Sequence, residues 1–220
     1  MRRINYTTYS KHFIKISYLF KFYAYFNYKM KLLLKTFLTL LLLSFSVDTL
    51  LAKKVDDSRI KMLNGEYAKL SDFHSDGPLI INFWTTWWPF CERQLAYLDQ
   101  LNSNFKETGL SVLAVNVNKP NILKQVRPYI NKRKYKFPVS VDPRSKLAKK
   151  FGVLGYPALY IVDKDGTIIY KSSGYEEGKE DEYLEELTDY FNVEGIVYKS
   201  FEYEKSKLVE TKEGRVTIDF

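Results

Sequence analysis

The feature that most constrains the fold is a run of apolar and aromatic residues that ends at the chain's single cysteine. It reads Ile80-Ile81-Asn82-Phe83-Trp84-Thr85-Thr86-Trp87-Trp88-Pro89-Phe90-Cys91. A short apolar run rich in β-branched and aromatic residues is typical of a buried strand. We therefore expect a central strand over 79–84, a tight turn after it, and a helix that begins near Cys91.

Strand and helix patterns alternate from Lys53 onward, which favours an α/β layer fold. Asn64-Gly65, between two short apolar runs, predicts a β-hairpin. Pro128 should bend or end the helix that contains it, and Asp142 or Ser145 should cap the next one. The other expected strands are 110–117, 137–141, 158–162 and 167–172, and the expected helices are 91–108, 122–131, 145–151 and 179–191.

Charge and metal-ligand counts exclude two classes of function. The formal charge is +8, but residues 53–220 hold 26 basic and 25 acidic side chains, so the folded part lacks the basic surplus of a nucleic-acid binder. Cys91 is the only cysteine, and His12 and His74 are the only histidines. No internal disulfide, Cys-based zinc site or His-rich metal site can form, and we expect no metal and no cofactor.

The N-terminal part has the pattern of an export signal. Lys31 and Lys35 precede the apolar stretch Thr36–Val47, which is too short to span a bilayer comfortably, and Ala52 suits a cleavage site. We predict a signal peptide over 30–52 and a protein exported to the bacterial envelope or periplasm. The alternative is an uncleaved inner-membrane anchor that faces outward. Residues 1–29 are a start-site artefact or a long n-region.

The remaining chain divides into a domain over 53–192 and a C-terminal extension over 193–220. Apolar residues alternate in places along the extension, as at Val216 and Ile218. This pattern predicts an edge strand or a hairpin.

Three segments carry a pattern more specific than periodicity. They are Asn82-Phe83-Trp84 with Trp87, Pro89 and Cys91; Ala114-Val115-Asn116-Val117; and Phe151-Gly152-Val153-Leu154-Gly155-Tyr156-Pro157-Ala158-Leu159-Tyr160-Ile161-Val162-Asp163-Lys164-Asp165-Gly166. Together they resemble the TlpA/ResA-like thiol-disulfide oxidoreductases, an envelope branch of the thioredoxin superfamily. The resemblance implies a thioredoxin-like three-layer sandwich with a mixed central sheet, and a cis Pro157 facing the position of the family's two thiols.

The chain departs from this family where the chemistry takes place. Trp88 stands at the position of the nucleophilic cysteine, and Cys91 matches the resolving cysteine. Gln94 and Ala96 also replace the Glu and Pro that often follow. A peroxiredoxin pattern would need Thr at 88 and Pro at 84, where this chain has Trp. We therefore expect no dithiol activity, and Cys91 is either an inert apolar residue or a monothiol.

These departures leave several functional hypotheses. The first is a non-catalytic protein that binds an extended polypeptide at Trp87, Trp88, Tyr156 and Pro157. The second is a monothiol redox protein that uses Cys91 in exchange or in a mixed disulfide. The third is an accessory subunit. Trp88 serves as a docking anchor in the first hypothesis, whereas the alternative makes it a lid over Cys91.

Overall fold

The computed structural model describes residue 23 and residues 25–39, 53–74, 76–176 and 178–202, with the backbone of 208–210 and 216–218. The chain forms two compact units, residues 1–52 and 53–220. In the first unit, residues 25–39 are helical. Within the described residues, no helix combines the length and the apolar character needed to cross a bilayer. The predicted signal peptide over 30–52 lies partly outside the described residues and stays a prediction.

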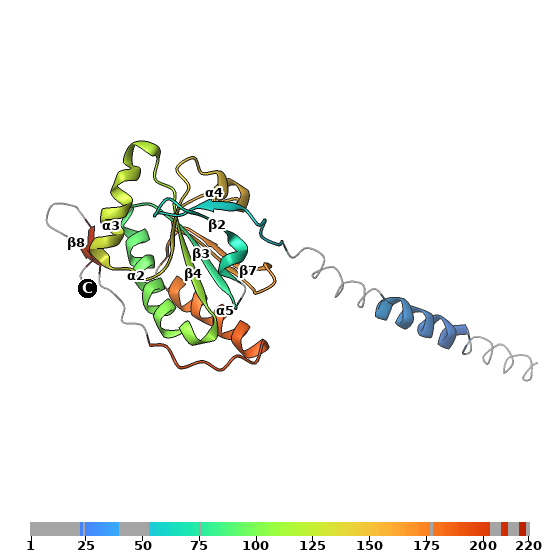
Figure 1. Cartoon of the computed structure of the whole chain (residues 1–220). Coiled ribbons are helices and arrows are strands. Elements are labelled where there is room, and N and C mark those ends of the chain that lie inside the picture. The colour runs from blue at the N-terminus through green and yellow to red at the C-terminus, as the bar shows by residue number, and fades with distance from the viewer. Residues whose placement is uncertain are drawn as a thin grey trace, which may run out of the picture. The chain divides into compact units, whose positions relative to one another are not determined.

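The second unit is built on a five-stranded mixed sheet with the strand order β5-β4-β3-β6-β7 (Figure 1). Its middle strand pairs in parallel with β4 and antiparallel with β6. Helices cover both faces, which confirms the expected three-layer α/β arrangement. The strands are β3 (Leu79–Trp84), β4 (Ser111–Asn116), β5 (Val139–Val141), β6 (Ala158–Val162) and β7 (Ile168–Ser173).

Alternation along the strands divides the core into two halves. Ile80 and Trp84 of β3 face the half that contains α2, whereas Ile81 and Phe83 face the half that contains α4. All six residues of β3 are buried, as the continuous apolar run predicts for a central strand. The helices are α2 (Pro89–Asn104), α3 (Val126–Arg133), α4 (Lys146–Phe151) and α5 (Lys179–Val193), with 3-10 turns η1 (Leu70–Phe73), η2 (Lys106–Thr108) and η3 (Pro120–Gln125).

Two helix boundaries, the end of α2 and the start of α3, differ from the sequence prediction. The helix expected to run to Thr108 ends earlier, and Gly109 follows η2 with φ of +81°. A Cβ on Gly109 would lie 2.3 Å from the backbone oxygen of Asp76, so glycine is needed there both for its conformation and for its size. The prediction that Pro128 bends or ends its helix was wrong. Because α3 begins at Val126, Pro128 lies in the first turn, where backbone N–H groups have no partner within the helix.

Asp142 caps α4, as one of the two expected alternatives stated. Its carboxylate accepts hydrogen bonds from the backbone N–H groups of Lys146 (2.8 Å), Leu147 (2.8 Å) and Ala148 (3.0 Å). The side chain of Ser145 makes no capping hydrogen bond. Asp142 therefore satisfies three donors that the start of a helix leaves open.

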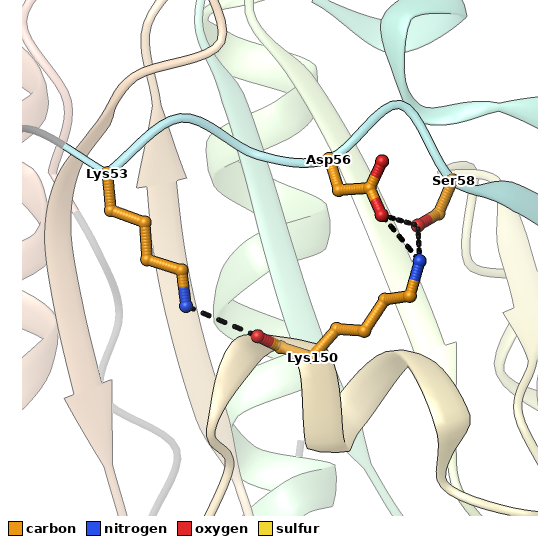
Figure 2. Close-up of polar contacts among 4 residues, drawn as sticks. All are labelled: Lys53, Asp56, Ser58 and Lys150. Carbon is orange, nitrogen blue, oxygen red and sulfur yellow. Dashed lines mark hydrogen bonds and ion pairs between the residues drawn. The ribbon is translucent and has the colours of Figure 1, made fainter.

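The first residues of this unit are fastened to its edge. The backbone N–H of Val55 donates to Gly166 (2.7 Å), and the Lys150 ammonium contacts Asp56 and Ser58 (Figure 2). Lys53 donates to the backbone oxygen of Lys150 (3.2 Å), near the negative end of the α4 dipole. The predicted hairpin follows as β1 (Arg59–Lys61) and β2 (Tyr67–Lys69).

The C-terminal extension contributes to the core and then forms a hairpin. After α5, Ile196, Tyr198 and Phe201 pack against the core half that contains α2. Strands β8 (Leu208–Glu210) and β9 (Val216–Ile218) pair with each other and form a separate two-stranded sheet. This confirms the hairpin alternative of the prediction, and β9 lies beside α2.

Candidate functional site

The register of the sheet brings the predicted site residues to one edge. Phe83 pairs with Ala158, so the turn that follows β3 and the Tyr156–Pro157 segment that precedes β6 lie at the same end of the two strands. The Tyr156–Pro157 peptide is cis, as the resemblance implies. Trp87, Trp88, Tyr156 and Pro157 thus lie at one edge of the molecule.

An aromatic row extends from this turn. Trp87 and Trp88 are 61% and 39% exposed, and their ring centroids are 5.9 Å apart. Trp88 continues to Phe90 at 5.4 Å, and Phe90 stacks on Tyr175 at 5.1 Å. We call Trp87, Trp88, Phe90 and Tyr175 the aromatic row. It gives this end of the protein an apolar, partly open surface of the kind that marks binding sites.

Cys91 lies behind this row and has no exposed surface. Its backbone N–H donates to the carbonyl oxygen of Trp88 (3.0 Å) in the first turn of α2. Burial raises the pKa of the thiol to about 11, against a smaller opposing effect of hydrogen bonds from Thr85. The thiol is therefore both inaccessible and protonated near neutral pH, whereas thiol-disulfide exchange needs an accessible thiolate.

Arg133, which pairs with the residue next to Cys91, is committed to partners other than the thiol. The Arg133 guanidinium lies 3.6 Å over the ring of Tyr129, and its Nε donates to Glu92 Oε1 (2.6 Å). The Tyr129 ring also packs against Trp84, with centroids 5.2 Å apart. Burial raises the pKa of Tyr129, with a smaller contribution from Glu92. Sequence reasoning did not identify this cluster, because its members come from separate helices.

Side-chain amides fix the turn between β3 and α2. The backbone N–H of Thr86 donates to Asn118 Oδ1 (3.1 Å), and Asn118 Nδ2 donates to Thr86 Oγ1 (2.7 Å). The N–H of Asn118 in turn donates to Asn116 Oδ1 (3.0 Å). These contacts of Thr86 and Asn118 involve neither Trp88 nor Cys91.

A buried ion pair contacts the aromatic row through Tyr175. Arg93 Nε lies 3.4 Å from Glu180 Oε1, with side chains only 5% and 2% exposed. The Tyr175 hydroxyl donates to the same carboxylate (2.7 Å), and the Tyr97 hydroxyl donates to the backbone oxygen of Glu180 (2.8 Å). Nothing in the sequence singled out Arg93 or Glu180, because charged residues on a helix are usually solvent-exposed.

The backbone beside the cis peptide offers one open position. The Pro157 carbonyl oxygen accepts a hydrogen bond from the Gly174 N–H (2.8 Å), and proline has no N–H to donate. Among the described residues, the backbone N–H and C=O of Tyr156 make no hydrogen bond to another backbone group.

Comparison with known proteins gives the family. The model of the AhpC/TSA family matches residues 51–171. The thiol-disulfide oxidoreductase ResA of Bacillus thuringiensis subsp. konkukian is 31% identical over 140 residues, which cover 63% of this chain and 79% of that protein. ResA of Geobacillus kaustophilus is 31% identical over 106 residues, which cover 48% of this chain and 59% of that protein.

Solved structures share the fold. A putative thiol:disulfide interchange protein DsbE from Chlorobium tepidum aligns with a TM-score of 0.58 at 21% identity, covering 63% of this chain and 95% of that one. The exposed lipoprotein thioredoxin of Streptococcus pneumoniae aligns with a TM-score of 0.51 at 26% identity, covering 61% of this chain and 99% of that one. These similarities confirm the expected thioredoxin-like fold.

Proposed function

Since this chain belongs to the AhpC/TSA family of thioredoxin-fold proteins and is related to the ResA thiol-disulfide oxidoreductases, we propose that it binds an extended polypeptide in the bacterial envelope without exchanging disulfides. The observation that carries the proposal is the state of Cys91, which is fully buried and has its pKa raised to about 11. With that pKa, roughly one thiol in 10,000 is ionised at pH 7.

The loss of exchange follows from the steps of the reaction. A thiolate attacks a disulfide, and a second thiol then resolves the mixed disulfide. This chain has one cysteine, so no second thiol of its own can complete the cycle. The residue three positions earlier is Trp88, whose side chain can neither attack nor resolve.

The binding surface combines an apolar anchor with an open backbone position. Trp87 and Trp88 are exposed, and Trp is among the residues that most often dominate binding energy. Tyr156, whose backbone makes no hydrogen bond to another backbone group within the described part of the chain, lies at the same edge of the sheet. An extended chain can add there as a strand while one of its apolar side chains contacts the aromatic row.

Export is the second part of the proposal. Its support is the basic and apolar pattern of residues 30–52, together with the likeness to a protein described as an exposed lipoprotein thioredoxin. N-terminal sequencing of the protein from envelope fractions should find Lys53 as the first residue. A membrane-bound product that retains residues 30–52 would favour the anchor.

Activity is tested by reduction of insulin disulfides. We expect the purified protein to show no turnover above background, and Trp88→Cys to gain some turnover. If the unchanged protein shows turnover and Cys91→Ser loses it, the proposal is contradicted and the monothiol hypothesis is favoured. Intact-mass measurement would then detect the adduct on Cys91.

Binding is tested with an unfolded, carboxymethylated protein as the probe, which presents extended chain without thiols. Trp88→Ala should weaken binding about tenfold or more while changing the melting temperature little. Val197→Ala, at a side chain that is 92% exposed, is the control and should change neither. If Trp88→Ala instead lowers the melting temperature sharply and leaves binding intact, Trp88 is a lid over Cys91.

A further inference from the structure

A concave region lies at the same edge of the sheet as the aromatic row, two strands away from it. It is a cavity of about 630 Å³ between the β1–β2 hairpin, the carboxyl end of β5 and α4. We call it the basic pocket, because five of its lining side chains are cationic: Arg59, Lys61, Arg144, Lys146 and Lys150. Its volume lies within the range of small-molecule sites.

Little negative charge compensates these cations. Asp142 carries the only carboxylate among the described residues that line the pocket, and it already accepts three backbone hydrogen bonds from the start of α4. Lys150, which lines the pocket, contacts Asp56 and Ser58 (Figure 2). Among the described residues, no ion pair forms at Arg59, Lys61, Arg144 or Lys146.

The concentration of charge is a local feature of a nearly neutral unit. Residues 53–220 carry a surplus of only one positive charge, so four unpaired cations around one cavity reflect a separation of charges. Many of the acidic residues lie instead on α5, whose first turn alone holds Glu180, Asp181 and Glu182. Like charges gathered around a cavity repel one another and raise the local concentration of anions.

We propose that the basic pocket binds a small organic anion that carries phosphate or carboxylate groups. Arg59 and Arg144 offer planar forks that suit either group, and Lys61 and Lys146 offer point charges. Tyr67 and Pro120 add apolar wall for the organic part of the ligand. The position agrees with the general tendency of α/β proteins to bind ligands outside the carboxyl ends of parallel strands. This site shares no residue with the polypeptide-binding surface proposed above.

The geometry of the positive groups is partly prearranged. Arg59 lies with its guanidinium 4.2 Å over the Tyr67 ring, and Arg59 and Lys61 project from the same side of β1 because they are two residues apart. Arg144 and Lys146 flank Ser145, the residue that immediately precedes α4. Cations from two separate elements therefore converge on the cavity, which favours a compact anion over a long acidic chain.

The experiment is calorimetric titration of the purified full chain with pyrophosphate and, separately, with citrate, at low and at moderate salt. We expect saturable binding of one equivalent of at least one anion, weaker at moderate salt. The two probes distinguish a phosphate ligand from a carboxylate ligand. A heptaglutamate peptide, titrated in parallel, represents an acidic segment of a partner protein.

Matched variants assign the site. Arg144→Gln with Lys146→Gln should weaken binding about tenfold or more, because two charge-assisted contacts are lost. Lys132→Gln with Lys136→Gln removes the same charge from exposed positions outside the pocket and should change affinity less than about twofold. Melting curves should show both double variants folded.

Three outcomes would overturn the proposal. The first is no saturable binding of either small anion. The second is equal weakening by both double variants, which would indicate a general response to net charge. The third is binding of heptaglutamate alone, which would make the pocket a contact surface for an acidic protein.

Discussion

Strand β3 and the turn that follows it are neighbours in sequence, but the strand is buried and paired whereas the turn is partly exposed and fixed by side-chain hydrogen bonds. Every residue of β3 is buried and the strand is paired on both sides. The turn holds its shape through the amide of Asn118 and leaves Trp87 and Trp88 open to solvent. The strand thus supports the fold, whereas the turn determines what the surface presents. A fold arranged in this way can keep its stability while its reactive positions change.

The sharpest test of this comparison sets Trp84 against Trp87. Trp84 is fully buried, so Trp84→Ala should lower the free energy of unfolding by about 3–5 kcal/mol. Trp87 is 61% exposed, and Trp87→Ala should change it by less than about 0.5 kcal/mol. Urea denaturation measures both, and similar losses would show that strand and turn form one stabilising unit.

The buried ion pair of Arg93 and Glu180 should contribute to the stability of the fold, as β3 does. Glu180→Ala leaves Arg93 buried without its partner and should lower the free energy of unfolding by about 3 kcal/mol. The exposed Glu182, which pairs with Lys179 on the same helix, is the control, and Glu182→Ala should have a much smaller effect. Urea denaturation again provides the measurement. A negligible loss in Glu180→Ala would show that the ion pair with Arg93 does not stabilise the fold.

The burial of Cys91 predicts a dependence of stability on pH. Its pKa is raised from 9.0 to about 11, so below pH 9 both states keep the proton. Between pH 9 and 11 only the unfolded state loses it, and the free energy of unfolding should fall by about 2–3 kcal/mol from this group. Denaturation midpoints across this range should fall less steeply in Cys91→Ala. Parallel curves would mean that the thiol ionises as easily in the folded protein.

The smallest effect is expected where the carboxyl end of β5 leads into α4. Asp142→Ala removes the cap of α4 and should lower the free energy of unfolding by about 1 kcal/mol. The same change removes the one carboxylate of the basic pocket, so pyrophosphate or citrate should bind more tightly although the protein is less stable. Denaturation and titration on the same sample measure the two effects. A parallel decrease of stability and affinity would count against the pocket.

The elements that the sequence predicted well are those with local causes. The apolar run of β3, the turn at Asn64-Gly65 and the hairpin at Gly166 each depend on neighbouring residues, and the structure has all three. The position of Pro128 was misjudged because 3-10 turn η3 delays the start of α3. That boundary depends on packing, which a local pattern does not contain.

The residues of the candidate site could be named from the sequence, whereas the residues that surround them could not. The resemblance located Trp88, Cys91 and Pro157, because their spacing along the chain is distinctive. The buried pair of Arg93 and Glu180 joins two helices that are distant in sequence, and the basic pocket gathers short segments from three regions of the chain. Neither could be recognised before the tertiary arrangement was known.

The hydrogen bonds of Lys53 and Val55 fix the end of the folded unit at which the chain enters it. Val55 is bonded to Gly166, in the turn after β6, whereas Pro157 lies just before the other end of that strand. Five strand residues, about 16 Å, separate the two ends. The chain therefore enters the folded unit at the end of β6 that lies opposite the cis peptide and the aromatic row.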